Sequence, residues 1–143
     1  MLVMAPGEVS VSYRLESDPV QVRAARAQAR TALPQWGLGE HTDLAELIVS
    51  ELVTNAIVHG QGQVQVRLSC ASGDLWAEVH DDGPGRPVRR CPGARDESGR
   101  GLELIDGLLD LHGGTRGVIA DRNRPGKTVY VAVSLGTDPA GPR

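Results

Sequence analysis

The sequence has no phenylalanine, two cysteines, one lysine and no long hydrophobic run. Because aromatic residues make up only 3% of the chain, we expect a core of Leu, Val, Ile and Ala, with Trp36 and Trp76 as large anchors. Cys70 and Cys91 are too few for a disulfide framework or a zinc site of the CxxC type. No apolar run approaches the roughly 20 residues that a membrane-spanning helix needs. The chain start lacks the basic and apolar regions of a signal peptide, so we expect a cytoplasmic protein without membrane contact.

The composition that remains is that of one globular domain. With 143 residues, 40% of them hydrophobic and 23% charged, the chain can bury a single core of two layers. The net charge of −3 gives no support for direct binding to nucleic acid. We predict a domain over residues 8–135, with tails at 1–7 and 136–143.

Alternation and helical spacing predict the order β-α-α-β-β-loop-α-β-β, which is typical of an α+β fold. We expect strands at 8–15, 63–70, 75–80, 117–120 and 128–135, and helices at 20–32, 41–60 and 102–112. The turns at 71–74 and 121–126 should close two antiparallel hairpins. Residues 86–98 show no periodicity and are expected to form a loop. Gly107, in the middle of the third helix, suggests close packing there.

The second predicted helix carries Glu51, Asn55 and His59 at positions i, i+4 and i+8. These three side chains fall within about 80° on one helix face, along a ridge about 12 Å long. Four apolar residues lie between and beside them: Leu44, Leu47, Ile48 and Val58. A solvated face is seldom so apolar, so the row predicts a second covered surface, the wall of a pocket. The alternative is a buried helix whose polar groups are satisfied internally.

Asp81, Gly83 and Gly85 directly follow a predicted strand. Glycines at alternate positions allow a planar ligand to approach the backbone, and a carboxylate at the strand end can accept a hydrogen bond from an exocyclic amine. A simple acidic turn is the alternative explanation.

Gly99, Arg100 and Gly101 precede the third predicted helix. Unhindered N–H groups at the positive end of a helix dipole form an anion site, to which Arg100 would add a guanidinium. A glycine hinge is the alternative. The segment Gly126-Lys127-Thr128 imitates the end of a P-loop, but position 121, where that pattern requires glycine, is Asp.

These motifs occur together and in one order, and in this the chain resembles the GHKL (Bergerat) ATP-binding domain of gyrase B and histidine kinases. It is most similar to the small single-domain branch, the anti-sigma-factor serine/threonine kinases. Residues 50–56 with His59-Gly60 resemble the N box, residues 81–85 the G1 box and residues 99–102 the G2 box. The resemblance runs from about residue 8 to residue 135.

The resemblance implies a two-layer sandwich in which a mixed, mostly antiparallel sheet is covered on one face by three helices. ATP would lie between the second and third helices, under the loop 86–98. It also implies a role for each matching residue. Glu51 would be the general base, Asn55 would hold Mg²⁺, Asp81 would bind the adenine amino group with the help of Thr128, Gly83 and Gly85 would make room for the base, and Gly99, Arg100, Gly101 and Leu102 would meet the phosphates. His59 would be a structural residue at the helix end.

The function that the resemblance implies is transfer of phosphate from Mg·ATP to a Ser or Thr of an anti-sigma-factor antagonist, together with sequestration of a sigma factor. Members of this branch often dimerise, which leaves a homodimer open. A complete histidine kinase is not expected at this length. Two alternatives remain: a nucleotide-binding interaction module without phosphotransfer, and an α+β domain that binds no nucleotide.

Overall fold

The computed structural model describes residues 8–83 and 97–136; of residues 97–101 it describes the backbone only. Gly85, the segment 86–96 and residues 1–7 and 137–143 lie outside the described residues. The elements are β1 (Val9–Leu15), α1 (Gln21–Gln35), the short 3-10 helix η1 (Gly39–His41), α2 (Thr42–His59), β2 (Val64–Ala71), β3 (Asp74–Asp81), α3 (Glu97–His112), β4 (Gly114–Ala120) and β5 (Lys127–Ser134). The predicted order of elements is confirmed.

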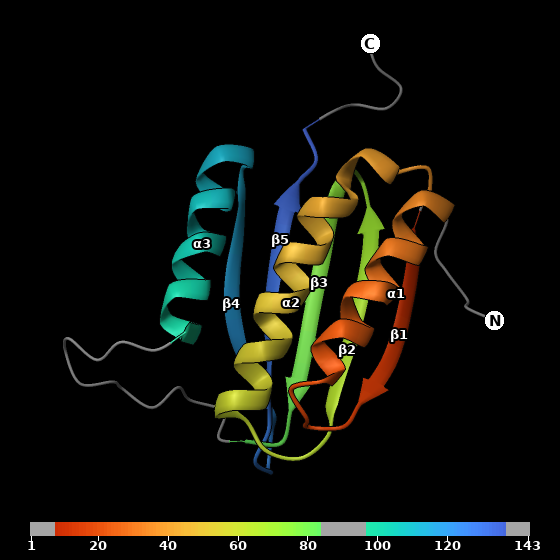
Figure 1. The fold of residues 1–143 in the computed structure, drawn as a ribbon. Coiled ribbons are helices and arrows are strands. Elements are labelled where there is room, and N and C mark those ends of the chain that lie inside the picture. Colours follow the sequence, from red (N-terminus) through yellow and green to blue (C-terminus); the bar gives the residue numbers. More distant parts are fainter. Residues whose placement is uncertain (1–7, 84–96, 137–143) are drawn as a thin grey trace.

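Five strands form one sheet in the order β1-β2-β3-β5-β4, and all four described pairings are antiparallel. The two predicted hairpins are present as β2–β3 and β4–β5. The prediction of a mixed sheet was wrong for this part of the chain. Between β1 and β2 the chain passes through α1 and α2, which run in opposite directions, so β2 enters the sheet antiparallel to β1 (Figure 1).

The three helices cover one face of the sheet, and the core lies between the two layers (Figure 1). The largest fully buried side chains are Leu, Ile and Val, as expected from the lack of phenylalanine. Trp36 packs against this core as expected. Trp76 does not, because it alternates with the buried Leu75 and Ala77 and so points to the opposite face, where its ring lies 6.0 Å from that of Tyr130.

α2 is the central helix and lies between α1 and α3 (Figure 1). It buries seven of its 18 residues: Ala45, Ile48, Val49, Ser50, Leu52, Val53 and Ala56. It ends at His59, where the N–H of Gly60 donates to the carbonyl of Ala56 at 2.7 Å. Its C-terminal end lies at the same end of the molecule as the end of β3 (Figure 1). None of the helices in the described residues is both long enough and apolar enough to cross a membrane.

α3 begins at Glu97, five residues before the predicted start at Leu102. Gly99, Arg100 and Gly101 therefore lie within the first turns of the helix and not ahead of it, which corrects the predicted boundary. The close packing expected at Gly107 is also absent, since a Cβ there would meet nothing within 4 Å among the described atoms. Among the side chains of α3 that the structure describes, Ile105 and Leu109 are buried in the core, and Leu102 and Leu108 pack against it.

Candidate functional site

The candidate site is built around Asp81, the last residue of β3. Alternation along β3 turns its side chain to the same face as the buried Leu75, Ala77 and Val79. Only 1% of Asp81 is exposed. The strand therefore places a carboxylate in the interior, at the point where α2 ends.

The two oxygens of Asp81 have different surroundings. Oδ1 accepts hydrogen bonds from the backbone N–H of Gly83 at 2.7 Å and from the ammonium of Lys127 at 3.0 Å, with the N–H of Gln61 at 3.4 Å. Oδ2 is buried and has no hydrogen-bond partner among the described residues. Because a buried acceptor without a partner costs free energy, Oδ2 is a place where a ligand donor would be stabilised.

Two glycines leave the space that Asp81 occupies. A Cβ added to Gly60 would lie 2.3 Å from Cγ of Asp81, and one added to Gly83 would lie 2.9 Å from its Oδ1. The segment after α2 is also tied to the end of β3, because the N–H of Asp82 donates to the carbonyl of Gln61 at 2.7 Å. Glycine at positions 60 and 83 is therefore required for the backbone to close around the carboxylate.

The polar row on α2 leads away from this carboxylate. At 1.5 Å per residue, Asn55 lies about 7.5 Å and Glu51 about 13.5 Å along the helix before Gly60. Both side chains are half-buried, and neither has a hydrogen bond or ion pair within the described part of the chain. They are thus not satisfied internally, which favours the pocket wall over the alternative of a buried helix. His59 is half-buried and does interact with its surroundings.

The apolar residues beside this row are only partly covered. Ile48 is buried, Leu44 and Leu47 are half-buried, and Val58 is 58% exposed. The second covered surface expected from the sequence is therefore incomplete among the described residues. It is continuous with the core at Ile48 and opens toward solvent at Val58.

The start of α3 lies at the same end of the molecule as the end of α2 (Figure 1). Gly99 lies in the first turn of α3, where backbone N–H groups lack intrahelical partners. The side chain of Leu102 packs against the core, so only its backbone could face a phosphate. The end of α2, which follows Glu51 and Asn55, and the glycines at the start of α3 thus lie at the same end of the helical layer.

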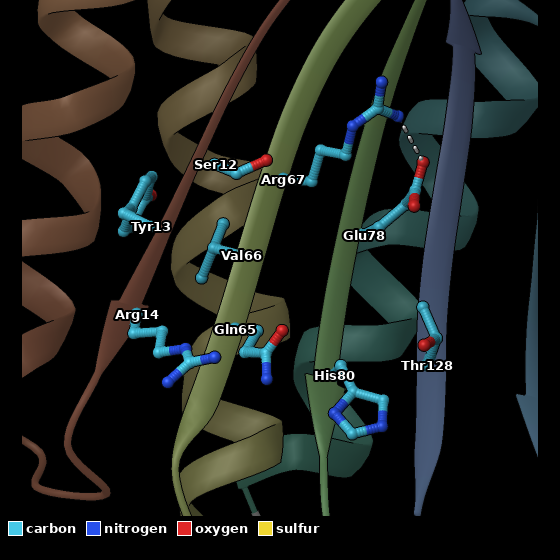
Figure 2. Close-up of a pocket in the computed structure, with 9 residues that line it drawn as sticks. All are labelled: Ser12, Tyr13, Arg14, Gln65, Val66, Arg67, Glu78, His80 and Thr128. Carbon is cyan, nitrogen blue, oxygen red and sulfur yellow. Dashed lines mark hydrogen bonds and ion pairs between the residues drawn. The ribbon is translucent and has the colours of Figure 1, made fainter. Parts of the chain in front are cut away.

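Thr128 is not brought to this site. It pairs with His80 across β3 and β5, on the face of the sheet that the helices leave open, where both side chains are seen together (Figure 2). Lys127, which pairs with Asp81, is the β5 residue on the helix-covered face. The expected help from Thr128 therefore does not fit the fold. Alternation with the buried Val129 and Val131 could have revealed Lys127 from the sequence.

A hollow of about 470 Å³ lies on the open face of the sheet, away from Asp81 (Figure 2). Its lining comprises Ser12, Tyr13, Arg14, Gln65, Val66, Arg67, Glu78, His80 and Thr128. Several of its polar side chains have partners: Arg67 pairs with Glu8 and Glu78, and His80 lies 2.9 Å from Asp121. It offers no buried acceptor without a partner, so we place the candidate site at Asp81.

No group of three or more His, Cys, Asp or Glu side chains suited to a metal ion occurs among the described residues. Mg²⁺ does not require such a group, because it is commonly held by one or two protein oxygens together with substrate phosphates and water. The amide oxygen of Asn55 is of the required kind.

A sequence model of the histidine kinase-like ATPase domain matches residues 15–132. The chain therefore belongs to this family, the GHKL type of ATP-binding domain, as its motifs predicted. The predicted fold class is confirmed with it, apart from the mixed sheet.

Solved structures with the same fold include two histidine kinases. The histidine kinase domain from the blue-light activated histidine kinase of Erythrobacter litoralis EL346 is 23% identical, with a TM-score of 0.50 over 85% of this chain and 62% of that one. Acinetobacter baumannii histidine kinase AdeS is 13% identical, with a TM-score of 0.52 over 89% of this chain and 68% of that one. The chain thus spans less than two thirds of the first of these structures. At these identities the likeness concerns the fold alone, and the roles of individual residues stay predictions.

Proposed function

We propose that this chain binds Mg·ATP between α2 and α3 and transfers its terminal phosphate to a Ser or Thr of a partner protein, as anti-sigma-factor kinases do. The observation that carries the proposal is the buried, unpartnered Oδ2 of Asp81. Within the GHKL family such an acceptor matches the amino group of adenine. Gly60 and Gly83 hold the surrounding backbone close to it.

Each residue then has a separate task. Bound Mg·ATP would supply the phosphoryl group and neutralise the charge that develops on its transfer. Asp81 would accept a hydrogen bond from the base, Asn55 would contribute an amide oxygen to the metal, and the N–H groups at the start of α3 would donate to phosphate oxygens. Glu51 would take the proton of the attacking hydroxyl while its oxygen bonds to the γ-phosphorus and the bond from that phosphorus to the oxygen of ADP breaks. Gly85 and Arg100 keep the roles that the resemblance implies, as predictions.

A binding module without phosphotransfer is the second candidate. It is supported by Glu51, which has no hydrogen-bond partner to orient it among the described residues. A catalytic base is usually held by a further group. In such a binding module, ATP fixes the shape of a docking surface, and no phosphate is transferred.

Incubation with γ-labelled ATP, Mg²⁺ and a candidate anti-sigma-factor antagonist distinguishes the kinase from the binding module. The kinase proposal predicts label on the antagonist with the wild type, and loss of label with Glu51→Ala while Mg·ATP binding is kept. Asp110→Ala, which removes an exposed carboxylate near the C-terminal end of α3, is the control and should label normally. A stable complex without label would favour the module, and labelling by Glu51→Ala at the wild-type rate would refute the role of Glu51.

The proposed partners are an anti-sigma-factor antagonist and a sigma factor. A homodimer and a cytoplasmic location are further parts of the proposal. Recovery of partners from the native cell extract with and without ATP would test them.

A further inference from the structure

Lys127 is the only lysine in a chain that otherwise uses arginine. It is 7% exposed, and its Nζ lies 3.0 Å from Oδ1 of Asp81. A buried ion pair is weak evidence for stability, because an apolar pair of similar volume often does as well or better. The position of this pair at the candidate nucleotide site therefore suggests a role in binding.

Lys127 makes the two oxygens of Asp81 unequal. Its ammonium and the N–H of Gly83 both bond to Oδ1, and each therefore fixes the rotation of the carboxylate. Oδ2 is then left buried without a partner in the described structure. An ionised carboxylate can only accept hydrogen bonds, so Oδ2 is open to a donor.

This arrangement distinguishes two classes of purine. A 6-aminopurine presents a donor, whereas a 6-oxopurine presents an acceptor at the same position. An ionised carboxylate attracts the first and repels the second. Without the ammonium on Oδ1, Oδ2 is no longer held toward the base, so loss of Lys127 would relax the selection.

We propose that Lys127 is a positioning residue that fixes Asp81 as an acceptor and so selects 6-aminopurine over 6-oxopurine nucleotides. The inference rests on the proposed binding of ATP and adds a residue that the motifs did not identify. Lys127 acts through Asp81 and does not itself contact the base.

The test is calorimetric titration of Mg·ATP and Mg·ITP, which differ in the group at position 6 of the base and in the hydrogen that the 6-oxo form carries on N1. The wild type should prefer ATP by at least about tenfold, as expected for one hydrogen bond to a charged group. Lys127→Met should reduce this preference to about threefold or less, and Lys127→Arg, which keeps the charge, should retain it. Lys127→Gln, whose shorter and uncharged side chain does not replace the ammonium on Oδ1, should also lose preference and replaces Lys127→Met if that variant does not fold.

Val129→Ala is the structural control, because Val129 is the next buried β5 residue on the same face. It should lower the unfolding temperature and leave the ATP-to-ITP ratio unchanged. A wild-type ratio in the neutral Lys127 variants would overturn the inference while ATP binding stands. Failure of the wild type to bind either nucleotide would refute the proposed function and the inference together.

Discussion

The α-carbon of Gly60 lies against the carboxylate of Asp81, so closely that a Cβ at position 60 would lie 2.3 Å from Cγ and 2.6 Å from Oδ1 of Asp81. The same Cβ would also lie 2.5 Å from the carbonyl oxygen of Ala56. The end of α2 and the end of β3 thus meet with no room for a side chain. This contact fixes the distance between the polar row on α2 and the buried acceptor.

Gly60→Ala should therefore disturb both stability and binding. We expect a loss of about 1–3 kcal/mol in the free energy of unfolding, as for overpacked interior sites, because the new methyl group must push α2 away from Asp81. The affinity for Mg·ATP should fall as well. Urea unfolding and calorimetric titration measure the two effects.

Gly107→Ala is the matched control for that substitution. A Cβ there meets nothing within 4 Å, and alanine is a better helix former than glycine by about 0.5–1 kcal/mol. This variant should be more stable than the wild type and bind nucleotide equally well. An equal loss in the free energy of unfolding in both variants would contradict the proposed packing at Gly60.

Asn55 should determine the metal dependence of binding. Asn55→Ala removes the amide oxygen that would hold Mg²⁺, so Mg²⁺ should no longer strengthen ATP binding, whereas Asn55→Asp retains an oxygen ligand and should keep much of that effect. Titration of ATP with and without Mg²⁺ measures the difference. If Asn55→Ala keeps the full gain from Mg²⁺, the metal is held elsewhere.

The ion pair between Asp106 on α3 and Arg116 on β4 should make a small contribution to stability that depends on pH. The hydrogen bond from Nε of Arg116, 2.6 Å long, lowers the pKa of Asp106. A lowered folded pKa means that the contribution is present above the unfolded value of about 3.9 and is lost as pH falls through the folded value. Because Asp106 is 51% exposed, we expect no more than about 0.5–1 kcal/mol.

Urea unfolding of the wild type and Asp106→Asn at several pH values from 7 to 3 tests this contribution. The difference between the two should be constant above about pH 5 and shrink toward pH 3. Asp110→Asn on the same helix, where no partner is present among the described residues, is the control. A difference that grows as pH falls would contradict the assigned sign.

The sequence predicted the order of elements well because long apolar patterns and glycine turns determine it locally. It drew attention to Asp81 because the carboxylate follows a predicted strand next to two glycines, and the role of Asp81 in binding stays a prediction. It did not predict the fully antiparallel sheet, since the pairing of β3 with β5 depends on a path through α3 that no local pattern specifies.

Lys127 and Thr128 show what the resemblance to a family leaves out. The resemblance implied a role for Thr128, but a strand places adjacent residues on opposite faces. Alternation with the buried valines of β5 places Lys127 on the helix-covered face, and its ion pair with Asp81 depends on the register of two strands. The face on which each residue lies therefore follows from alternation along the strand and not from the resemblance.

The central claim is that ATP binds on the helix-covered side of the sheet at Asp81. NMR spectra of the labelled protein, recorded while Mg·ATP is added, test it most directly. Binding at Asp81 predicts saturable shifts of the amide signals of Asn55, Gly60 and Gly83, with Ser12 and Gln65 on the open face unchanged. Shifts confined to Ser12, Gln65 and their neighbours, or no shifts at millimolar ATP, would contradict this claim.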